Sequence, residues 1–567
     1  MSRVPNEQTG APGARTLPPR LDPRAGRPPR ANAGRPSTSA RSAPRSVGQD
    51  RRPDVTAGRT RSVPAGREIP APRFGAVLGL TTLGALLPGT ALVAAGAKKV
   101  GWAILAFAGV LVGVVLLLAT VGRTRVIQWA VNPTALLAII VAAVVLAVVW
   151  ALIIIAGYRM LAPRTTTRVQ HLVGTVLVSL LALAVATPAF EVAHLASVQR
   201  NLIQNVFADG ESATVDPAAP NAFTGKDRVN VLLLGGDGGA GRDGVRTDTV
   251  MVASIATDTG QTTLFSLPRN LENLPFPEDS PLSEVYPDGF EAGSESESLL
   301  NAVYRNGPAQ HPDILGPTDN PGADFLKLGV GVALGLNIDY YVLVNLDGFS
   351  RMVDALGGIT VNVNYYVPIN GEPTIGILPD DYIAPGPNQH MDGERALYFA
   401  RGRFGLNDYL RMDRQRCVLN AIVSAADPLT MLLKYQELAA TTQDIVSTDI
   451  PQNVLGDFAD LALKVKDAGL TSVVFDNSVI KPAYPDYDEI RSIVDRAISA
   501  PTPPADATTT SPTPASAASS APSGDSDATA AGEADPTQAK SVTDACAYDP
   551  VMAQEALDEG EPPTRRR

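Results

Sequence analysis

The residues of this chain that can do chemistry gather in three short patches, and the first is a glycine-dense loop. Residues 234–249 follow an apolar run and contain Asp237, Arg246 and Asp248. Carboxylates suit a hard divalent cation such as Mg²⁺, arginines suit phosphate oxygens in bidentate geometry, and glycines let the backbone approach a ligand closely. The patch indicates either a phosphate and metal site or a hairpin loop with solvated charges. It is not a Walker A loop, because Gly-Lys-Ser/Thr is missing.

The second and third patches place arginines where predicted elements end. Arg269 comes directly after an apolar run, a position where a single arginine is usually only a loop charge. Arg401 and Arg403 lie two residues apart and project to the same side if residues 399–403 are extended. Neither patch predicts a binding site by itself, but both add positive charge to the first patch if the fold brings them together.

A predicted helix follows the third patch and carries more polar residues. Asp408, Arg411 and Gln415 lie three and four residues apart, hence on one helix face, with Arg414 close beside them. The start of a helix itself favours an anion. Clustered arginines repel one another unless an anion lies between them. That anion is either a ligand or a carboxylate of the chain itself, such as Asp408 or Asp413.

The hydrophobic pattern after residue 228 supplies a scaffold for these patches, because apolar runs of strand length alternate with segments of helical periodicity. Strands are predicted at residues 229–234, 249–256, 261–267, 340–345 and 359–364. Helices are predicted at residues 296–304, 322–336, 346–356 and 408–425. Alternation of this kind predicts an α/β or α+β domain. Residues 429–498 continue it with helices around a strand at residues 472–475.

The two ends of the 567-residue chain have the composition of disordered tails. Residues 1–73 hold fifteen arginines and five acidic residues, although the net charge of the whole chain is −11. Residues 499–567 are rich in Ala, Pro, Ser and Thr. Neither tail has enough apolar surface to fold alone, so both are predicted to be disordered. A basic tail beside an acidic body argues against nucleic-acid binding; the tail would set membrane topology or contact anionic lipid.

Residues 74–196 form a predicted membrane region of three to four helices. Apolar stretches at residues 75–96, 101–121, 135–157 and 172–195 approach the ~20 residues that span a bilayer. Leu87-Pro88-Gly89 interrupts the first stretch, which is predicted to be a re-entrant or interfacial hairpin. Three spans and a cytoplasmic arginine-rich tail would place the following domain outside the cytoplasm; four spans with the tail outside would do the same. Residues 197–228 are then a juxtamembrane linker.

The cysteine and histidine content disfavours two enzyme classes. The chain has two cysteines, Cys417 and Cys546, at no CxxC or zinc-binding spacing, and its four histidines are scattered. A zinc enzyme or a cysteine-nucleophile enzyme is therefore not indicated. In an extracytoplasmic domain the two cysteines would form a disulfide. The alternative is a buried thiol in a helix and an unrelated cysteine in the tail.

Taken in order, the patches resemble the motifs of the LytR-CpsA-Psr family. Those motifs run approximately Leu-Leu-Gly-x-Asp … Arg-Ser/Thr-Asp-Thr, then Ser-Ile/Leu-Pro-Arg-Asp, aromatic-x-Arg-x-Arg and Asp-x-x-Arg-x-x-Arg-Gln. Connecting segments at residues 338–341, 349–358 and 391–397 match as well, so the resemblance spans roughly residues 229–423. The chain departs from the family at Asn270, where Asp is usual, and at Leu299, where Lys is usual. Asn270 would weaken a metal or structural contact, and Leu299 would alter substrate preference.

The resemblance implies an α-β-α layered catalytic domain with a central mixed sheet at residues 229–428, extended by residues 429–498. Members of the family are phosphotransferases that move a glycan polymer from a polyprenyl pyrophosphate carrier to peptidoglycan through a phosphodiester bond. The implied partners are the lipid-linked glycan, the peptidoglycan acceptor and membrane lipid, with no nucleic acid. The protein would be a multi-pass protein of the cell membrane with an extracytoplasmic catalytic domain.

The resemblance also implies a role for each matching residue. The catalytic residues, which would bind phosphate and stabilise the transition state, are Arg246, Arg269, Arg401, Arg403 and Arg411. Asp237 and Asp248 would hold Mg²⁺, and the substrate contacts would be Arg414, Gln415 and Asn301. The helix around residues 325–336 is either a wall for the prenyl chain or part of the core.

Two rival functions use the same residues. A hydrolase would let water replace the sugar hydroxyl as acceptor and release free phosphorylated glycan. A non-catalytic binding or regulatory protein would hold the lipid without reaction. Phosphoryl transfer depends mainly on positioning and electrostatic stabilisation, so a site of arginines and a metal without an obvious nucleophile fits the transferase.

Overall fold

The computed structural model describes residues 73–163, 167–207, 210–215, 223, 225–237, 245–426, 446–499, 535 and 537–565. The predicted disorder before residue 73 lies outside these residues, as does the part of the predicted C-terminal tail between residues 500 and 534. Seven residues of the first patch, 238–244, lie outside them as well.

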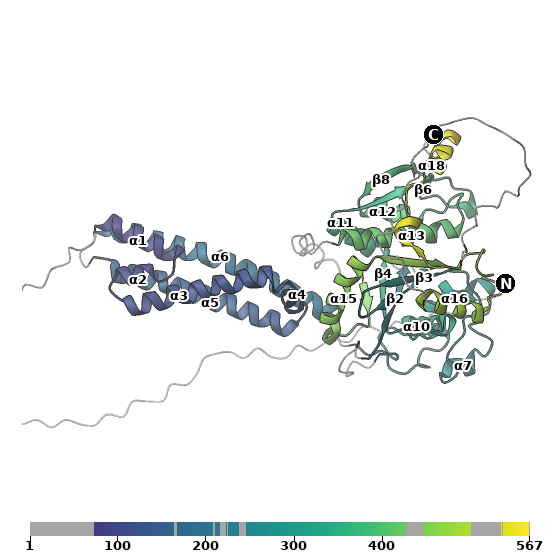
Figure 1. Ribbon diagram of the computed structural model, residues 1–567, viewed down its shortest axis with the longest axis horizontal. Helices are drawn as coiled ribbons and strands as arrows, with labels where there is room; N and C mark the ends of the chain where they lie inside the picture. The colour runs from purple at the N-terminus through teal and green to yellow at the C-terminus, as the bar shows by residue number, and fades with distance from the viewer. Residues whose placement is uncertain are drawn as a thin grey trace, which may run out of the picture. The chain divides into compact units, whose positions relative to one another are not determined.

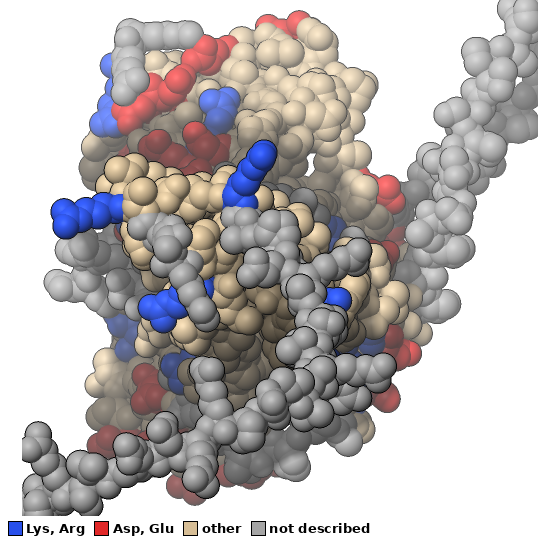
Figure 2. Space-filling view, turned by 90° about the vertical axis from the view of Figure 1, so that its left-hand side faces the viewer, with Lys and Arg blue, Asp and Glu red and all other residues tan. Residues whose placement is uncertain are grey.

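The described chain begins with six helices, most of them apolar. They are α1 (Phe74–Leu86), α2 (Thr90–Ala94), α3 (Lys98–Thr120), α4 (Arg123–Ala130), α5 (Pro133–Leu161) and α6 (Arg168–Val206). Three of these, α3, α5 and α6, are long and apolar enough to cross a membrane, and α5 and α6 pack along each other (Figure 1). The nearest described surface in Figure 2 is mostly uncharged, with separate basic side chains. Three helices of spanning length agree with the count that the sequence favoured.

The first apolar stretch is divided into α1 and α2. Pro88 has no backbone N–H to continue a helix, and Gly89 adopts a φ of +104°, which residues with a side chain rarely take. A Cβ atom at Gly89 would lie 2.3 Å from the carbonyl oxygen of Gly101, so the close approach to α3 also requires glycine. The break agrees with the prediction of a hairpin in place of a fourth full span.

A mixed sheet of seven strands forms the centre of the globular domain (Figure 1). The strands are β1 (Arg228–Gly236), β2 (Thr247–Ala256), β3 (Thr262–Leu267), β4 (Tyr340–Asn345), β9 (Val446–Thr448), β10 (Leu470–Val474) and β11 (Lys540–Ser541), in the order β11-β10-β3-β2-β1-β4-β9. Strand β1 is parallel to β4, and β3 to β10, while β2 is antiparallel to both of its neighbours. The carboxyl ends of β1, β3 and β4 therefore meet the amino end of β2 at one edge of the sheet.

Helices cover both faces of this sheet. On one face, Leu232, Val252 and Phe265 belong to a core with α9 (Leu300–Gln310), α10 (Pro321–Leu334) and α16 (Tyr487–Ser499). On the other face, Ala253 and Leu264 pack with α13 (Asp408–Ala425), α15 (Leu455–Ala468) and α17 (Val542–Ala545). Successive residues of one strand, such as Val252 and Ala253, point to opposite faces of the sheet and pack into different helical layers. The predicted α-β-α layering around a mixed sheet is confirmed.

A smaller hydrophobic cluster packs against the outer side of α13. It contains two two-stranded sheets, β5 (Ile359–Val363) with β8 (Gly386–Met391) and β6 (Val367–Ile369) with β7 (Asp381–Ile383). Val361 and Ile383 of these sheets pack with Phe399 of α12 (Gly393–Arg401), Val353 of α11 (Leu346–Leu356) and Val418 of α13. Because α13 has packing partners on two sides, its rotation about its own axis is fixed.

Two sequence expectations change inside the domain. Phe325 and Val330 of α10 are fully buried in the main core, so α10 is a core helix and the reading as a wall for the prenyl chain is wrong. The segment at residues 281–304, where only the helix at residues 296–304 was predicted, contains α7 (Pro281–Val285), α8 (Glu295–Ser298) and the start of α9. A proline at the first turn of α7 and a serine cap make this short helix possible.

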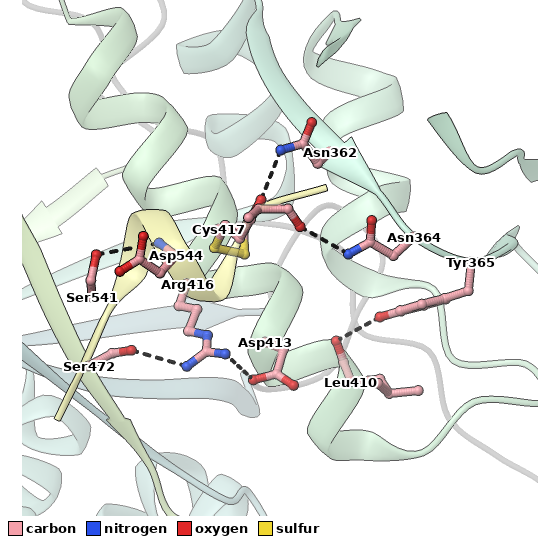
Figure 3. Close-up of a disulfide and its surroundings, with 12 residues drawn as sticks. Asn362, Asn364, Tyr365, Leu410, Asp413, Arg416, Cys417, Ser472, Ser541 and Asp544 are labelled. Atoms are coloured by element: carbon pink, nitrogen blue, oxygen red, sulfur yellow. Dashed lines mark hydrogen bonds and ion pairs between the residues drawn. A yellow bond between two sulfur atoms is a disulfide. The ribbon is translucent and has the colours of Figure 1, made fainter. Parts of the chain in front are cut away.

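The expected disorder of residues 499–567 is wrong for the described residues 537–565. Strand β11 pairs with β10, α17 and α18 (Pro550–Glu559) follow, and Cys546 forms a disulfide with Cys417 of α13 (Figure 3). Asn362 and Asn364 donate hydrogen bonds to the carbonyls of Cys546 and Ala547. A segment that buries little apolar surface is thus ordered by a covalent link and by backbone pairing, which composition does not reveal.

Candidate active site

A cavity of about 330 Å³ opens where β1 and β4 end and β2 begins. It lies between the sheet and the three helices α11, α12 and α13. Along α13 its lining changes from Arg411 and Gln415 to Val418 and Ile422, so one part is polar and the other apolar. Six of the ten residues predicted for the site line it: Asp237, Asp248, Arg401, Arg403, Arg411 and Gln415. The remaining four lie around it.

Asp248, at the start of β2, connects several of these elements. Its Oδ1 atom accepts hydrogen bonds from Arg269 Nη1 at 3.0 Å and from Asn301 Nδ2 at 3.1 Å. Burial alone would raise the pKa of Asp248, but the charge of Arg269, the hydrogen bond from Asn301 and the charge of Arg411 together hold this pKa below its usual value. Asp248 is therefore kept ionised, the form that binds a cation.

Arg269 and Asn301 lie behind Asp248, outside the cavity lining. The Nε atom of Arg269 also lies 3.4 Å from Oδ1 of Asp408. Asn301 is 5% exposed, and within the described part of the chain its Oδ1 atom has no hydrogen-bond partner. Both residues hold Asp248 in place, and the direct phosphate and substrate contacts expected of them stay predictions.

Asp237 follows β1 and is fixed by the backbone on the other side of the loop. Its Oδ1 atom accepts a hydrogen bond from the backbone N–H of Arg246 at 2.7 Å, and its own N–H donates to the Arg246 carbonyl at 3.1 Å. Gly236, just before it, lines the cavity, and a Cβ atom there would lie 2.9 Å from a methyl group of Val245. Glycine thus lets the loop close tightly beside the carboxylate.

The guanidinium of Arg246 turns away from the cavity lining. It forms an ion pair with Glu297 of α8, and Glu297 also pairs with Arg305. Asn306 donates a further hydrogen bond to Glu297 at 2.7 Å. The structure therefore places Arg246 in an ionic cluster next to the site, while only its backbone touches Asp237. Glu297 was not singled out from the sequence, because a glutamate in an acidic segment gives no signal of its partners.

Arg401 and Arg403 both line the cavity, although residues 399–403 are not extended. Helix α12 ends at Arg401, and the chain turns at Gly402 before Arg403. A Cβ atom at Gly402 would lie 2.6 Å from the carbonyl oxygen of Pro368, so glycine is required at this turn. Both arginines reach the same cavity, as expected. A helix end and a turn bring them together, however, and not the alternation of side chains along an extended strand.

Helix α13 presents Arg411 and Gln415 to the cavity. The side chain of Asn407 caps the helix by accepting a hydrogen bond from the backbone N–H of Leu410 at 2.8 Å. Arg411 is 3% exposed and its Nη2 atom lies 3.0 Å from Oδ2 of Asp408. Burial lowers the pKa of Arg411, which Asp408 and Asp248 oppose. Its Nε atom has no hydrogen-bond partner within the described residues, and a buried donor of this kind at a cavity suits an anion.

Arg414, three residues later, is not part of the lining. Its Nε donates to the carbonyl of Phe399 at 2.7 Å, its Nη1 to the hydroxyl of Tyr365 at 2.9 Å, and its Nη2 to the carbonyl of Gly402. The side chain is 4% exposed. The structure therefore separates Arg414 from Arg411 and Gln415, with which the sequence grouped it.

The apolar part of the cavity was not expected from the sequence. Its helical walls come from one side each of α11 and α13: Leu346, Phe349, Met352, Val418, Leu419 and Ile422. The sheet contributes Leu233, Met251, Val342 and Val344. The spacing of three and four residues on both helices does predict a buried apolar face, but spacing cannot tell whether that face meets the core or an open cavity.

The fit of the site to a divalent cation rests on the aspartate pair. Asp237 and Asp248 both line the polar part of the cavity, and their oxygens are donors that Mg²⁺ prefers. The described residues contain no group of three or more His, Cys, Asp or Glu side chains that could hold a metal. A cation at this pair would complete its coordination with water and phosphate oxygens, which is how Mg²⁺ is commonly bound.

The fold and site together define a class: an α/β protein with apolar anchoring helices and a cavity that joins arginines and carboxylates to an apolar wall. A model of the LytR_cpsA_psr family matches residues 196–484, and the chain belongs to that family.

Two relatives carry the same functional name, polyisoprenyl-teichoic acid–peptidoglycan teichoic acid transferase TagU. The protein from Enterococcus faecalis is 31% identical over 249 residues, which are 43% of this chain and 67% of the relative. The protein from Bacillus mycoides is 28% identical over 231 residues, 40% of this chain and 62% of the relative. The chain thus spans about two thirds of the length of these relatives. The crystal structure of TagV from B. subtilis has 23% identity and a TM-score of 0.33, covering 48% of this chain and 97% of that one.

Proposed function

We propose that this protein transfers a glycan polymer from a polyprenyl pyrophosphate carrier to peptidoglycan and forms a phosphodiester link. One observation carries the proposal: a single cavity joins Arg401, Arg403 and Arg411 at one part to an apolar wall at the other. A polyprenyl pyrophosphate has the same two parts, a charged diphosphate and a long apolar chain. The names of the relatives, which describe transfer of teichoic acid to peptidoglycan, support the same reaction class.

The reaction is a phosphoryl transfer. A hydroxyl oxygen of the peptidoglycan acceptor forms a bond to the phosphorus that carries the glycan, and the bond from this phosphorus to the bridging oxygen breaks. The hydroxyl proton passes to solvent water, and polyprenyl phosphate is the leaving group. Arg401, Arg403 and Arg411 oppose the negative charge that builds on the phosphate oxygens. Gln415 supplies a neutral hydrogen bond beside them, and Arg269 and Asn301 hold Asp248 in place.

We include Mg²⁺ at Asp237 and Asp248 in the proposal. The cation would neutralise part of the charge of the pyrophosphate and would make the leaving phosphate more stable. The arginines come from other elements than the aspartates: Arg401 and Arg411 belong to α12 and α13 and Arg403 to the turn between them, whereas Asp237 directly follows β1 and Asp248 lies in β2. Arginines and a cation would thus both bind the diphosphate.

We also propose that the catalytic domain lies outside the cytoplasm. Helices α3, α5 and α6 alternate in direction if each spans the membrane, so Lys98, Lys99, Arg159 and Arg168 share one side. Arg123 and Arg125 share the other side with the domain. The larger number of basic residues favours the cytoplasm for the first side. The disulfide between Cys417 and Cys546 supports the same assignment, because disulfides persist in oxidising compartments.

The decisive experiment measures phosphodiester-linked polymer on purified peptidoglycan from cells with and without this gene, and with Arg403→Ala in its place. The proposal expects the linked polymer to be lost in both altered strains. Release of free phosphorylated glycan by the purified wild type, without attachment to peptidoglycan, would favour a hydrolase. Undiminished polymer with Arg403→Ala would favour a binding or regulatory protein.

A further inference from the structure

Arg414 is a buried arginine without a place in the cavity. It lies on α13 between Arg411 and Gln415, which line the cavity, and it faces the smaller hydrophobic cluster. The guanidinium is 5.7 Å from the centre of the Tyr365 ring and 6.0 Å from that of Phe399. Burial of a charged group of this size is costly unless its donors are satisfied. Its hydrogen-bond partners therefore indicate what the side chain is for.

These partners belong to the segment that carries the two neighbouring arginines. Phe399 is two residues before Arg401, and Gly402 lies between Arg401 and Arg403. Arg414 donates to the carbonyls of both Phe399 and Gly402. The planar guanidinium holds these two acceptors in a fixed relation, because its donors form a rigid fork. One carbonyl is in the last turn of α12 and the other is in the turn after it.

Tyr365 completes the arrangement from a third element. Its hydroxyl accepts a hydrogen bond from Arg414 at 2.9 Å, and it lies 3.4 Å from the carbonyl of Leu410 as a donor (Figure 3). Burial raises the pKa of Tyr365, so the hydroxyl keeps its proton. The segment between β5 and β6, the end of α12 and the start of α13 are thus joined at one guanidinium.

We propose that Arg414 is a positioning residue that sets the separation of Arg401 and Arg403 from Arg411 by fixing the carbonyls of Phe399 and Gly402. It acts through these arginines and does not touch the substrate. The catalytic consequence of this inference rests on the proposed function, but the positioning of the turn by Arg414 does not. Loss of Arg414 frees the turn at Gly402, so Arg401 and Arg403 no longer share a fixed place at the diphosphate.

The test compares Arg414→Lys with Arg416→Ala in the full chain in detergent micelles. Lysine keeps the positive charge but has one nitrogen, which cannot hold both carbonyls and Tyr365 in a planar fork. Arg416 is a matched control on the same helix: it pairs with Asp413 and Ser472, away from the cavity (Figure 3). Tyr365→Phe removes one of the three acceptors of Arg414, together with the longer hydrogen bond to the Leu410 carbonyl, and serves as a milder variant if Arg414→Lys does not fold.

The first readout does not depend on the function. Trypsin cleavage after Arg401 and Arg403, followed by mass spectrometry, reports whether the turn has opened. Arg414→Lys should speed this cleavage at least tenfold, Tyr365→Phe less, and Arg416→Ala should match the wild type. Unchanged cleavage in Arg414→Lys and in Tyr365→Phe would overturn the inference.

The second readout is the binding of farnesyl diphosphate. Arg414→Lys should weaken it roughly tenfold, the effect of a lost hydrogen bond to a charged group. The effect should be smaller in an Arg403→Ala background, where Arg401 alone is left to be displaced. A direct phosphate contact would instead be largely retained by lysine, and its loss would add to that of Arg403. If the wild type does not bind the probe while Arg414→Lys still opens the turn, the proposed function fails and the positioning role stands.

Discussion

The two sides of α13 carry the same residue type at nearly the same burial, yet they serve different ends. Arg411 is 3% exposed and Arg414 is 4% exposed. Arg411 faces a cavity, has carboxylates beside it and keeps one donor without a partner in the described residues. Each nitrogen of Arg414 has an acceptor from the chain itself. Residue type and burial are therefore not what decides whether an arginine binds a ligand or stabilises the fold. The partners around its guanidinium decide it.

The largest effect is expected from the cavity side. Arg411→Ala should lower the transfer rate about 100- to 1,000-fold, the loss typical of removing one group that stabilises charge in a transition state. The melting temperature should change little, because Asp408 keeps Arg269 as a partner. Rates of polymer attachment to peptidoglycan, measured with the purified full chain, check this expectation. A loss below fivefold would mean that Arg411 is structural, as Arg414 is.

On the opposite side of α13, loss of the disulfide should lower the stability of the fold and leave the transfer rate nearly unchanged. Cys546→Ser removes a disulfide that links residues 129 apart, which should lower the free energy of unfolding by roughly 2–4 kcal/mol. The rate per folded molecule should stay within a factor of two or so, because Cys417 does not line the cavity. Chemical denaturation gives the first quantity and active-site titration the second. Full stability in the serine variant would show that backbone pairing of β11 alone orders the C-terminal segment.

The apolar part of the cavity should show a smaller effect that depends on the lipid. Phe349→Ala removes part of a half-buried apolar wall, which should weaken binding of a long prenyl diphosphate by about 1 kcal/mol, or roughly fivefold. Binding of inorganic pyrophosphate should not change, since Phe349 lies on the apolar wall. Calorimetry with the two ligands separates these outcomes. An equal loss for both would place the side chain near the charged part instead.

The smallest effect is a pH dependence of stability at Asp248. Its pKa is depressed in the folded protein, so the stabilisation that it contributes is present above its unfolded pKa of about 3.9 and disappears as the pH falls through the folded value. Asp248→Asn should therefore be less stable than the wild type at pH 6, and the gap should close below about pH 4. Melting temperatures across this range measure the gap. A gap that widens on acidification would contradict the depressed pKa.

Local sequence patterns predicted much of the fold. Strand β4 and helix α11 have the boundaries that their apolar patterns indicated; β2 and β3 differ only at their first residues, by one or two positions, and β1 differs by one residue at its start and two at its end. These elements have strong periodicity and clear turn residues between them, such as Gly357. The helix α4 and the strands β6 to β9 were not predicted. Strands β6, β7 and β9 have three residues each, too few for a periodic signal, and β8 is mostly polar.

Residue types and their order fixed the family, the chemistry and the residues worth testing, since phosphate and Mg²⁺ demand arginines and carboxylates whatever the fold. Tertiary structure alone decided which of them share a cavity. It set Arg411 and Gln415 apart from Arg414, turned the Arg246 side chain towards Glu297, and joined Cys417 to Cys546. The physical reason is that a side chain's partners come from elements distant in sequence. The rotation of α13 between the sheet and the smaller cluster selects those partners, and no local pattern encodes it.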